Sequence, residues 1–164
     1  MKNLFTLFLC FFTLSAHAGQ LENFFTQLEG QWEKISADNY RETAAGEFTH
    51  QVGTYFTANV KRVGQEWKFL EEVCWAEEDQ DEACGESFVT YEIQNEELFA
   101  ILENEKYPVD VLELDDDSLT MMLVTKDFAF TAILSVDEKG LSQESVIEMA
   151  DGNKDYLFLK LRKQ

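Results

Sequence analysis

Few stretches of this chain combine the residue types and the spacing that chemistry requires. The stretch DGNKD (residues 151–155) begins like a calcium-binding loop, in which oxygen-bearing side chains alternate along the chain. Tyr156 stands where such a loop needs a glycine, and Arg162 stands where it needs a bidentate glutamate. We therefore interpret the stretch as a hairpin turn and expect no metal site.

The sequence offers few residues that could form a nucleophile and its activating base. The chain has two histidines, His17 and His50, and no GxSxG stretch accompanies a histidine and a carboxylate that would activate a serine. Carboxylate pairs remain open as acid and base, because 32 Asp and Glu residues always offer some pair. We expect neither an enzymatic activity nor a cofactor.

The cysteines point to an oxidised protein. Cys74 and Cys84 flank the acidic stretch WAEEDQDEA, and their spacing is not the CxxC of a redox or metal site. Cys10 lies in the first eighteen residues, which have the pattern of a cleaved signal peptide, so Cys74 and Cys84 would remain as an even pair, which in an exported protein is by default a disulfide. Closing this loop of about ten residues should stabilise the fold by roughly 2–3 kcal/mol in the chain-entropy model.

The first eighteen residues, MKNLFTLFLCFFTLSAHA, have the pattern of a secretory signal peptide. Lys2 precedes an apolar run from Leu4 to Leu14, and Ala16-His17-Ala18 provides the small residues of a cleavage site. The run is too short for a membrane anchor, which needs about 20 apolar residues. We therefore expect a signal peptide at 1–18, one domain at 19–164, no stable membrane anchor, and a periplasmic or secreted location.

The net charge limits the choice of partners. The chain has 13 Lys and Arg and 32 Asp and Glu; cleavage would remove Lys2, so 12 basic residues would remain, for a net charge of −20. Such a surface repels nucleic acid and anionic lipid, and it attracts cationic proteins over about a Debye length of 8–10 Å. The alternative reading is that the charge only keeps an exported protein soluble.

Hydrophobic periodicity predicts a short helix followed by strands. Leu21, Phe24, Phe25 and Leu28 recur at helical spacing, so a helix should lead up to Gly30. After it, alternating stretches are separated by short polar turns. The expected strands are GQWEKIS (30–36), THQVGTYFTANVKRV (49–63), WKFLEEVCWAE (67–77), ESFVTYEIQ (86–94), LFAILENE (98–105), VDVLELD (109–115), SLTMMLVT (118–125), DFAFTAILSV (127–136), LSQESVIEM (141–149) and YLFLKLRK (156–163).

These elements predict an all-β fold, an antiparallel up-and-down β-barrel of about 8–10 strands with a short N-terminal helix. Sequential hairpins without long crossovers make an antiparallel meander, and closing it into a barrel removes the exposed edges. A two-sheet sandwich is the alternative.

The stretch Gly30-Gln31-Trp32, between the helix and the first strand, resembles the N-terminal signature of the lipocalin-like calycin superfamily. The resemblance implies that Trp32 closes the base of the barrel and that a basic residue of the last strand lies across its ring. Arg162 is the matching position, with Lys160 the second candidate. Ten strands suit a fatty-acid-binding-protein barrel better than an eight-stranded lipocalin.

Two classes of function follow from this fold. The first is an exported binding protein that holds a small apolar or amphipathic ligand, neutral or cationic because of the acidic rim, in the end of the barrel away from Trp32. The second is an acidic protein-binding module, resembling the periplasmic inhibitors of lysozymes, that blocks a cationic protein. The aromatic residues predicted to contact the ligand are Phe56, Phe69, Trp75, Phe128 and Phe130.

Overall fold

The computed structural model describes residues 19–77 and 82–164. The expected signal peptide at 1–18 lies outside the described residues, as does the centre of the acidic loop at 78–81. The N-terminal helix covers residues 19–28, so it ends two residues before Gly30, where the sequence predicted its end. Within the described residues, no helix has both the length and the apolar character needed to cross a membrane.

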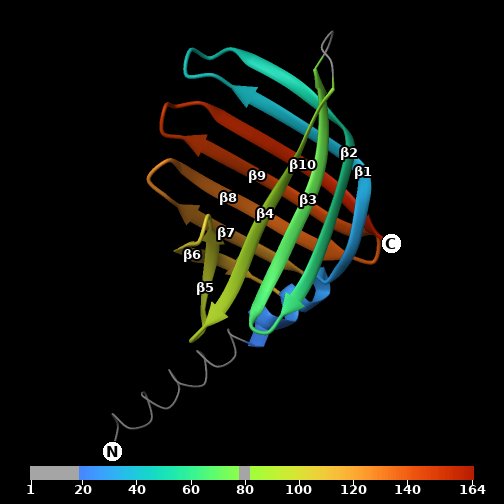
Figure 1. Cartoon of the computed structure of the whole chain (residues 1–164), viewed down its shortest axis with the longest axis vertical. Coiled ribbons are helices and arrows are strands. Elements are labelled where there is room, and N and C mark those ends of the chain that lie inside the picture. The colour runs from blue at the N-terminus through green and yellow to red at the C-terminus, as the bar shows by residue number, and fades with distance from the viewer. Residues whose placement is uncertain (1–18, 78–81) are drawn as a thin grey trace, which may run out of the picture.

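The described residues form ten strands that close into one antiparallel barrel, as the sequence predicted (Figure 1). Each strand pairs with the next along the chain, and the first pairs with the last. The fold is therefore a closed up-and-down barrel and not a sandwich. The strands are β1 (Gly30–Glu42), β2 (Phe48–Val63), β3 (Glu66–Glu77), β4 (Ala83–Gln94), β5 (Glu97–Leu102), β6 (Glu105–Leu114), β7 (Ser118–Val124), β8 (Phe128–Asp137), β9 (Gly140–Met149) and β10 (Lys154–Lys163).

Tight turns explain how a short chain makes so many strands. The β4–β5 turn places Asn95 and Glu96 at positive φ, and the β5–β6 turn does the same with Glu103 and Asn104. Two consecutive left-handed residues make the kind of turn whose twist matches that of the flanking strands. These two turns let β5 remain short, so β4 rises beyond it and pairs with β5 only from Thr90 to Gln94.

The helix closes one end of the barrel, called the base below. Its four predicted apolar residues are fully buried, as their helical spacing requires. Phe25 lies at the centre of this contact, with ring centroids 5.4 Å from Trp67 and 5.5 Å from Tyr91. The helix is visible as the blue ribbon beneath β2 and β3 in Figure 1. The opposite end, called the mouth, carries the β1–β2 and β9–β10 turns.

Trp32 is buried at the base, with 2 % of its surface exposed, and its indole Nε1 donates a hydrogen bond to the Leu28 carbonyl oxygen at 2.8 Å. That carbonyl is one of the acceptors that a helix leaves unsatisfied at its C-terminus. Trp32 therefore lies at the base, as the calycin resemblance implied, and its hydrogen bond ties the helix to the first strand.

The basic residue over Trp32 is Lys163, so the prediction of Arg162 or Lys160 was wrong. Lys163 Nζ lies 5.4 Å from the ring centroid, whereas Arg162 points outward and pairs with Glu33. Alternation explains the error, because Leu159 and Leu161 face the interior and residue 163 shares their side of β10.

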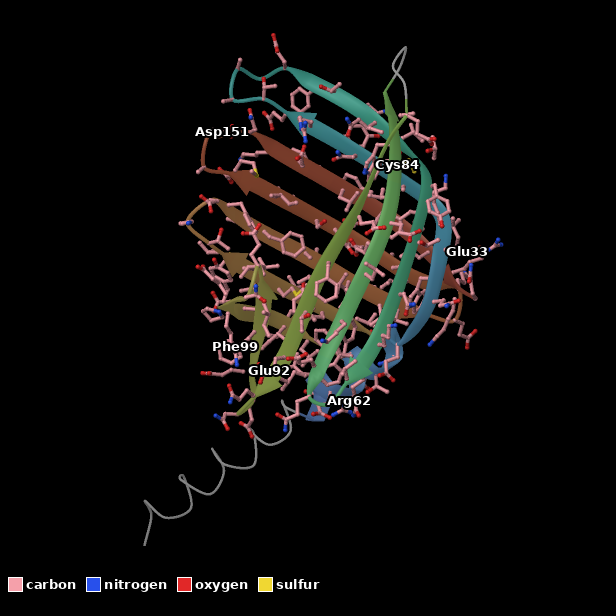
Figure 2. The ribbon with its side chains drawn as sticks, viewed as in Figure 1. Glu33, Arg62, Cys84, Glu92, Phe99 and Asp151 are labelled. Atoms are coloured by element: carbon pink, nitrogen blue, oxygen red, sulfur yellow. A yellow bond between two sulfur atoms is a disulfide. The ribbon has the colours of Figure 1, made fainter. Side chains whose placement is uncertain are left out.

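Gly30 makes room for this lysine. A Cβ at Gly30 would lie 2.6 Å from Lys163 Cε, and the glycine has φ +134°, a conformation that side chains disfavour. The expected arginine–indole contact does exist at the base, but on a different tryptophan. Arg62 lies 4.6 Å from the ring centroid of Trp67, at the same end of the barrel as the helix (Figure 2).

The disulfide between Cys74 and Cys84 is confirmed. The two residues are direct cross-strand partners on β3 and β4, so the bond joins the ends of two neighbouring strands. Figure 2 shows Cys84 toward the mouth, far from Arg62 at the base. The bond therefore holds together the part of β4 that extends above β5.

Candidate functional site

A cavity of about 180 Å³ lies inside the barrel above the helix. Most of its wall is apolar, and a few polar side chains interrupt it on β3, β4 and β9. An apolar pocket with a few convergent polar groups is the usual form of a small-molecule site. The lining residues are Leu28, Ala58, Val60, Phe69, Glu71, Val89, Tyr91, Met121, Phe130, Leu134, Leu141, Gln143, Ser145, Ile147, Leu157 and Leu161.

The structure brings two of the five predicted ligand contacts together in this cavity. Phe69 comes from β3 and Phe130 from β8, and both side chains line its wall. The two strands lie on different sides of the barrel, so only its closure places these rings around one space. Alternation along β8 puts Phe130 on the same face as Leu134, which also lines the cavity.

The other three predicted residues lie elsewhere. Phe56 is buried in the core with 3 % of its surface exposed, and Trp75 packs against that core nearer the disulfide. Phe128 lines a separate, more polar hollow at the mouth, together with Tyr107 and the exposed Phe88. The five aromatic residues therefore do not form one site.

Glu71 is the feature of the cavity that aromatic content did not indicate. Its side chain is half-buried and lines the cavity, on the same inward face of β3 as Phe69. Ser87, its direct partner on β4, donates a hydrogen bond from Oγ to Glu71 Oε2 at 2.8 Å. Among the described residues, no other side chain or backbone group bonds to this carboxylate, and no Lys or Arg lies within ion-pair distance.

Burial dominates the electrostatics here. Removal from water raises the pKa of Glu71 above its ordinary value, and the hydrogen bond from Ser87 opposes part of that rise. Burial also raises the pKa of the Tyr91 phenol, and the negative charge of Glu71 raises it further. Tyr91 is thus a neutral hydroxyl, and Glu71 is the ionisable carboxyl group of the cavity.

Polar side chains from β9 complete the cavity wall. Gln143 Nε2 donates a hydrogen bond to Ser145 Oγ at 3.2 Å, and Ser145 is 5 % exposed. Alternation in LSQESVIEM could have identified both, because they share the inward face with Leu141. Glu71 was harder to find from the sequence, since a glutamate in so acidic a chain is usually solvated.

The buried carboxylate predicts a pH-dependent gain in stability for Glu71→Gln. In the unfolded chain Glu71 loses its proton near the ordinary pKa of 4.5, whereas in the folded protein it keeps the proton to a higher pH. The free energy of unfolding therefore falls as the pH rises from 4.5 through the raised pKa of the folded state. Glu71→Gln has no carboxyl group to ionise, so its free energy of unfolding should not fall in this way. We expect it to raise the free energy of unfolding by about 1–3 kcal/mol at about pH 7, and to have little effect at about pH 4.

Urea denaturation at both pH values measures this difference. Glu72→Gln is the matched control, because it removes the same charge from the next residue of β3, whose side chain is exposed. Equal stability changes for the two variants at neutral pH would contradict a special cost at Glu71.

Comparison with known proteins gives one solved structure to report. No family model matches the chain, and no curated protein matches it. The structure is that of the zebrafish ileal bile acid-binding protein complexed with cholic acid, with a TM-score of 0.37 and 11 % sequence identity, over 84 % of this chain and 99 % of that chain. With so few identical residues, we carry no ligand and no site residue over from that protein.

Proposed function

We propose that this chain is an exported binding protein, not an enzyme, and that it holds a small apolar or amphipathic molecule inside its barrel. The observation that carries the proposal is the cavity of about 180 Å³, with an apolar wall and a few inward polar groups. A dry apolar cavity of about 150 Å³ is large enough to bind benzene, so this one suits a single ring with a short substituent.

Export is part of the proposal and has two supports. The first eighteen residues have the pattern of a signal peptide, and the disulfide between Cys74 and Cys84 is of the kind that persists in oxidising compartments. These two features together support a periplasmic or secreted location.

Binding of a neutral apolar probe tests the proposal. We expect toluene to bind and to raise the melting temperature, because a ligand that binds only the folded state stabilises it. Ala58→Leu should weaken this binding, since residue 58 lines the cavity and a larger side chain would fill part of it. Thr57→Leu is the matched control, because residue 57 is on the opposite face of β2. Calorimetry measures the affinity of each variant.

One outcome would favour the other function class. If no apolar probe binds at millimolar concentration, while a basic protein such as a lysozyme binds with an affinity that falls steeply with salt, the lumen is only a packed core. The acidic surface, with a net charge of −19 over the whole chain, would then be the functional feature.

A further inference from the structure

The inward face of β3 contains a carboxylate at a position where apolar residues surround it. Phe69 and Val73 are the neighbours of Glu71 on that face; Phe69 belongs to the hydrophobic core and Val73 packs against it. A leucine there would continue the apolar wall at no electrostatic cost. A half-buried carboxylate with no oppositely charged partner is unfavourable, so its presence in a cavity indicates a site for something that the protein binds.

The carboxylate is held in place and incompletely satisfied. Ser87 fixes Oε2 at 2.8 Å, and Oε1 accepts no hydrogen bond from any described residue. A carboxylate has about four lone-pair positions, so most of its acceptor capacity is left for a ligand in the cavity. Ser87 is therefore a positioning residue, and Glu71 is the acceptor.

The remaining wall supplies no positive charge. From β2, Ala58 lies beside Glu71, β4 contributes Tyr91, and the N-terminal helix contributes Leu28. Ser87, the direct partner of Glu71 on β4, is uncharged. On the far wall, β9 contributes Gln143 and Ser145, which do not ionise. Among the described lining residues, Glu71 alone carries a charge. A carboxylate or phosphate ligand would meet repulsion with no compensating cation, whereas a cation would meet its counter-ion.

From this arrangement, and resting on the proposed function, we infer that the cavity selects a small protonated amine. The apolar part of the ligand contacts Phe69 and Phe130, and its ammonium group donates a hydrogen bond to Glu71 Oε1. Charge-assisted hydrogen bonds of this kind are stronger than neutral ones, and the cost of burying the carboxylate has already been met in folding. The volume limits the ligand to about one ring and a short chain.

The inference also predicts the direction of the pH dependence. Because burial raises the pKa of Glu71, lowering the pH protonates the carboxyl group in the free protein and removes the negative charge that the amine needs. Affinity for an amine should therefore fall as the pH is lowered through that pKa. Affinity for a neutral ligand of the same shape should not change in this way.

Three probes of nearly the same size distinguish the effect of the ligand's charge from that of its fit to the cavity: benzylamine, benzyl alcohol and benzoate. Calorimetric titration of the purified protein at neutral pH should rank them in that order. Glu71→Gln should weaken benzylamine binding by about tenfold or more, since a charge-assisted hydrogen bond is lost and each 1.4 kcal/mol is a factor of ten. Benzyl alcohol can also donate its hydroxyl to Glu71, but without a charge of its own, so its affinity should fall clearly less than that of benzylamine. Far-UV circular dichroism of the variant checks that it folds. Glu72→Gln, the same change on the outer face, should alter neither.

The outcomes distinguish this inference from the proposed function. If benzyl alcohol binds the wild type, but benzylamine binds no more tightly and Glu71→Gln changes neither affinity, the amine inference is overturned and the apolar site stands. If none of the three probes binds at millimolar concentration, the proposed binding function fails, and the amine inference fails with it.

Discussion

Trp32→Ala should lower the free energy of unfolding by about 3–5 kcal/mol, the usual cost of truncating a large buried aromatic side chain. The change empties the base of the barrel, removes the hydrogen bond to the Leu28 carbonyl, and leaves Lys163 without the ring that it covers. Urea denaturation followed by far-UV circular dichroism measures the loss.

Two companion variants separate these contributions. Trp32→Phe keeps most of the buried ring and removes the Nε1 donor, so it should cost clearly less than the alanine variant. Lys163→Gln removes only the cation over the ring, which is worth about 0.5–1 kcal/mol at an exposed site. An alanine variant that unfolds at the wild-type midpoint would show that Trp32 does not hold the base together.

Phe25→Ala should be comparably damaging, again by about 3–5 kcal/mol. The ring is fully buried, and it contacts Trp67, Phe69 and Tyr91, so it joins the helix to two neighbouring strands. Losing it weakens the only described element that closes the base. Thermal and urea denaturation report the stability, and the fluorescence of the tryptophans reports whether the helix still packs.

Asn23→Ala is the control for this prediction, because Asn23 lies on the exposed side of the same helix. An exposed substitution away from caps and networks usually changes stability by less than about 0.5 kcal/mol. If Phe25→Ala cost no more than Asn23→Ala, the helix would be an appendage and not part of the core.

The order and type of the elements could be predicted because the relevant signals are local. Polar turns separate the strands, and alternation assigns an inner and an outer face to each of them, as in β8, where Phe130 and Leu134 share the lumen. The disulfide was predictable for a similar reason, since Cys74 and Cys84 flank one hairpin loop.

Two kinds of prediction were wrong. One followed a family motif in place of the alternation of the strand, and the other concerned residues whose neighbours depend on the three-dimensional fold. The resemblance to calycins suggested Arg162, but the inward leucines at 159 and 161 already place residue 163 on the inner face. The grouping of the aromatic residues could not be read from the chain at all, because the barrel's closure determines which strands face one another. Glu71 was hidden by composition, as one glutamate among many.

The pairing of β1 with β10 has a consequence for how the chain matures. Synthesis delivers β1 early, yet the ladder that runs from Trp32 opposite Lys163 to Glu42 opposite Lys154 has no partner until β10 has followed. Until then β1 exposes an unpaired edge, and such edges attract those of other chains. Mutual repulsion between chains of strongly negative charge opposes that encounter. The acidity of this protein thus protects its nascent state as well as its finished surface.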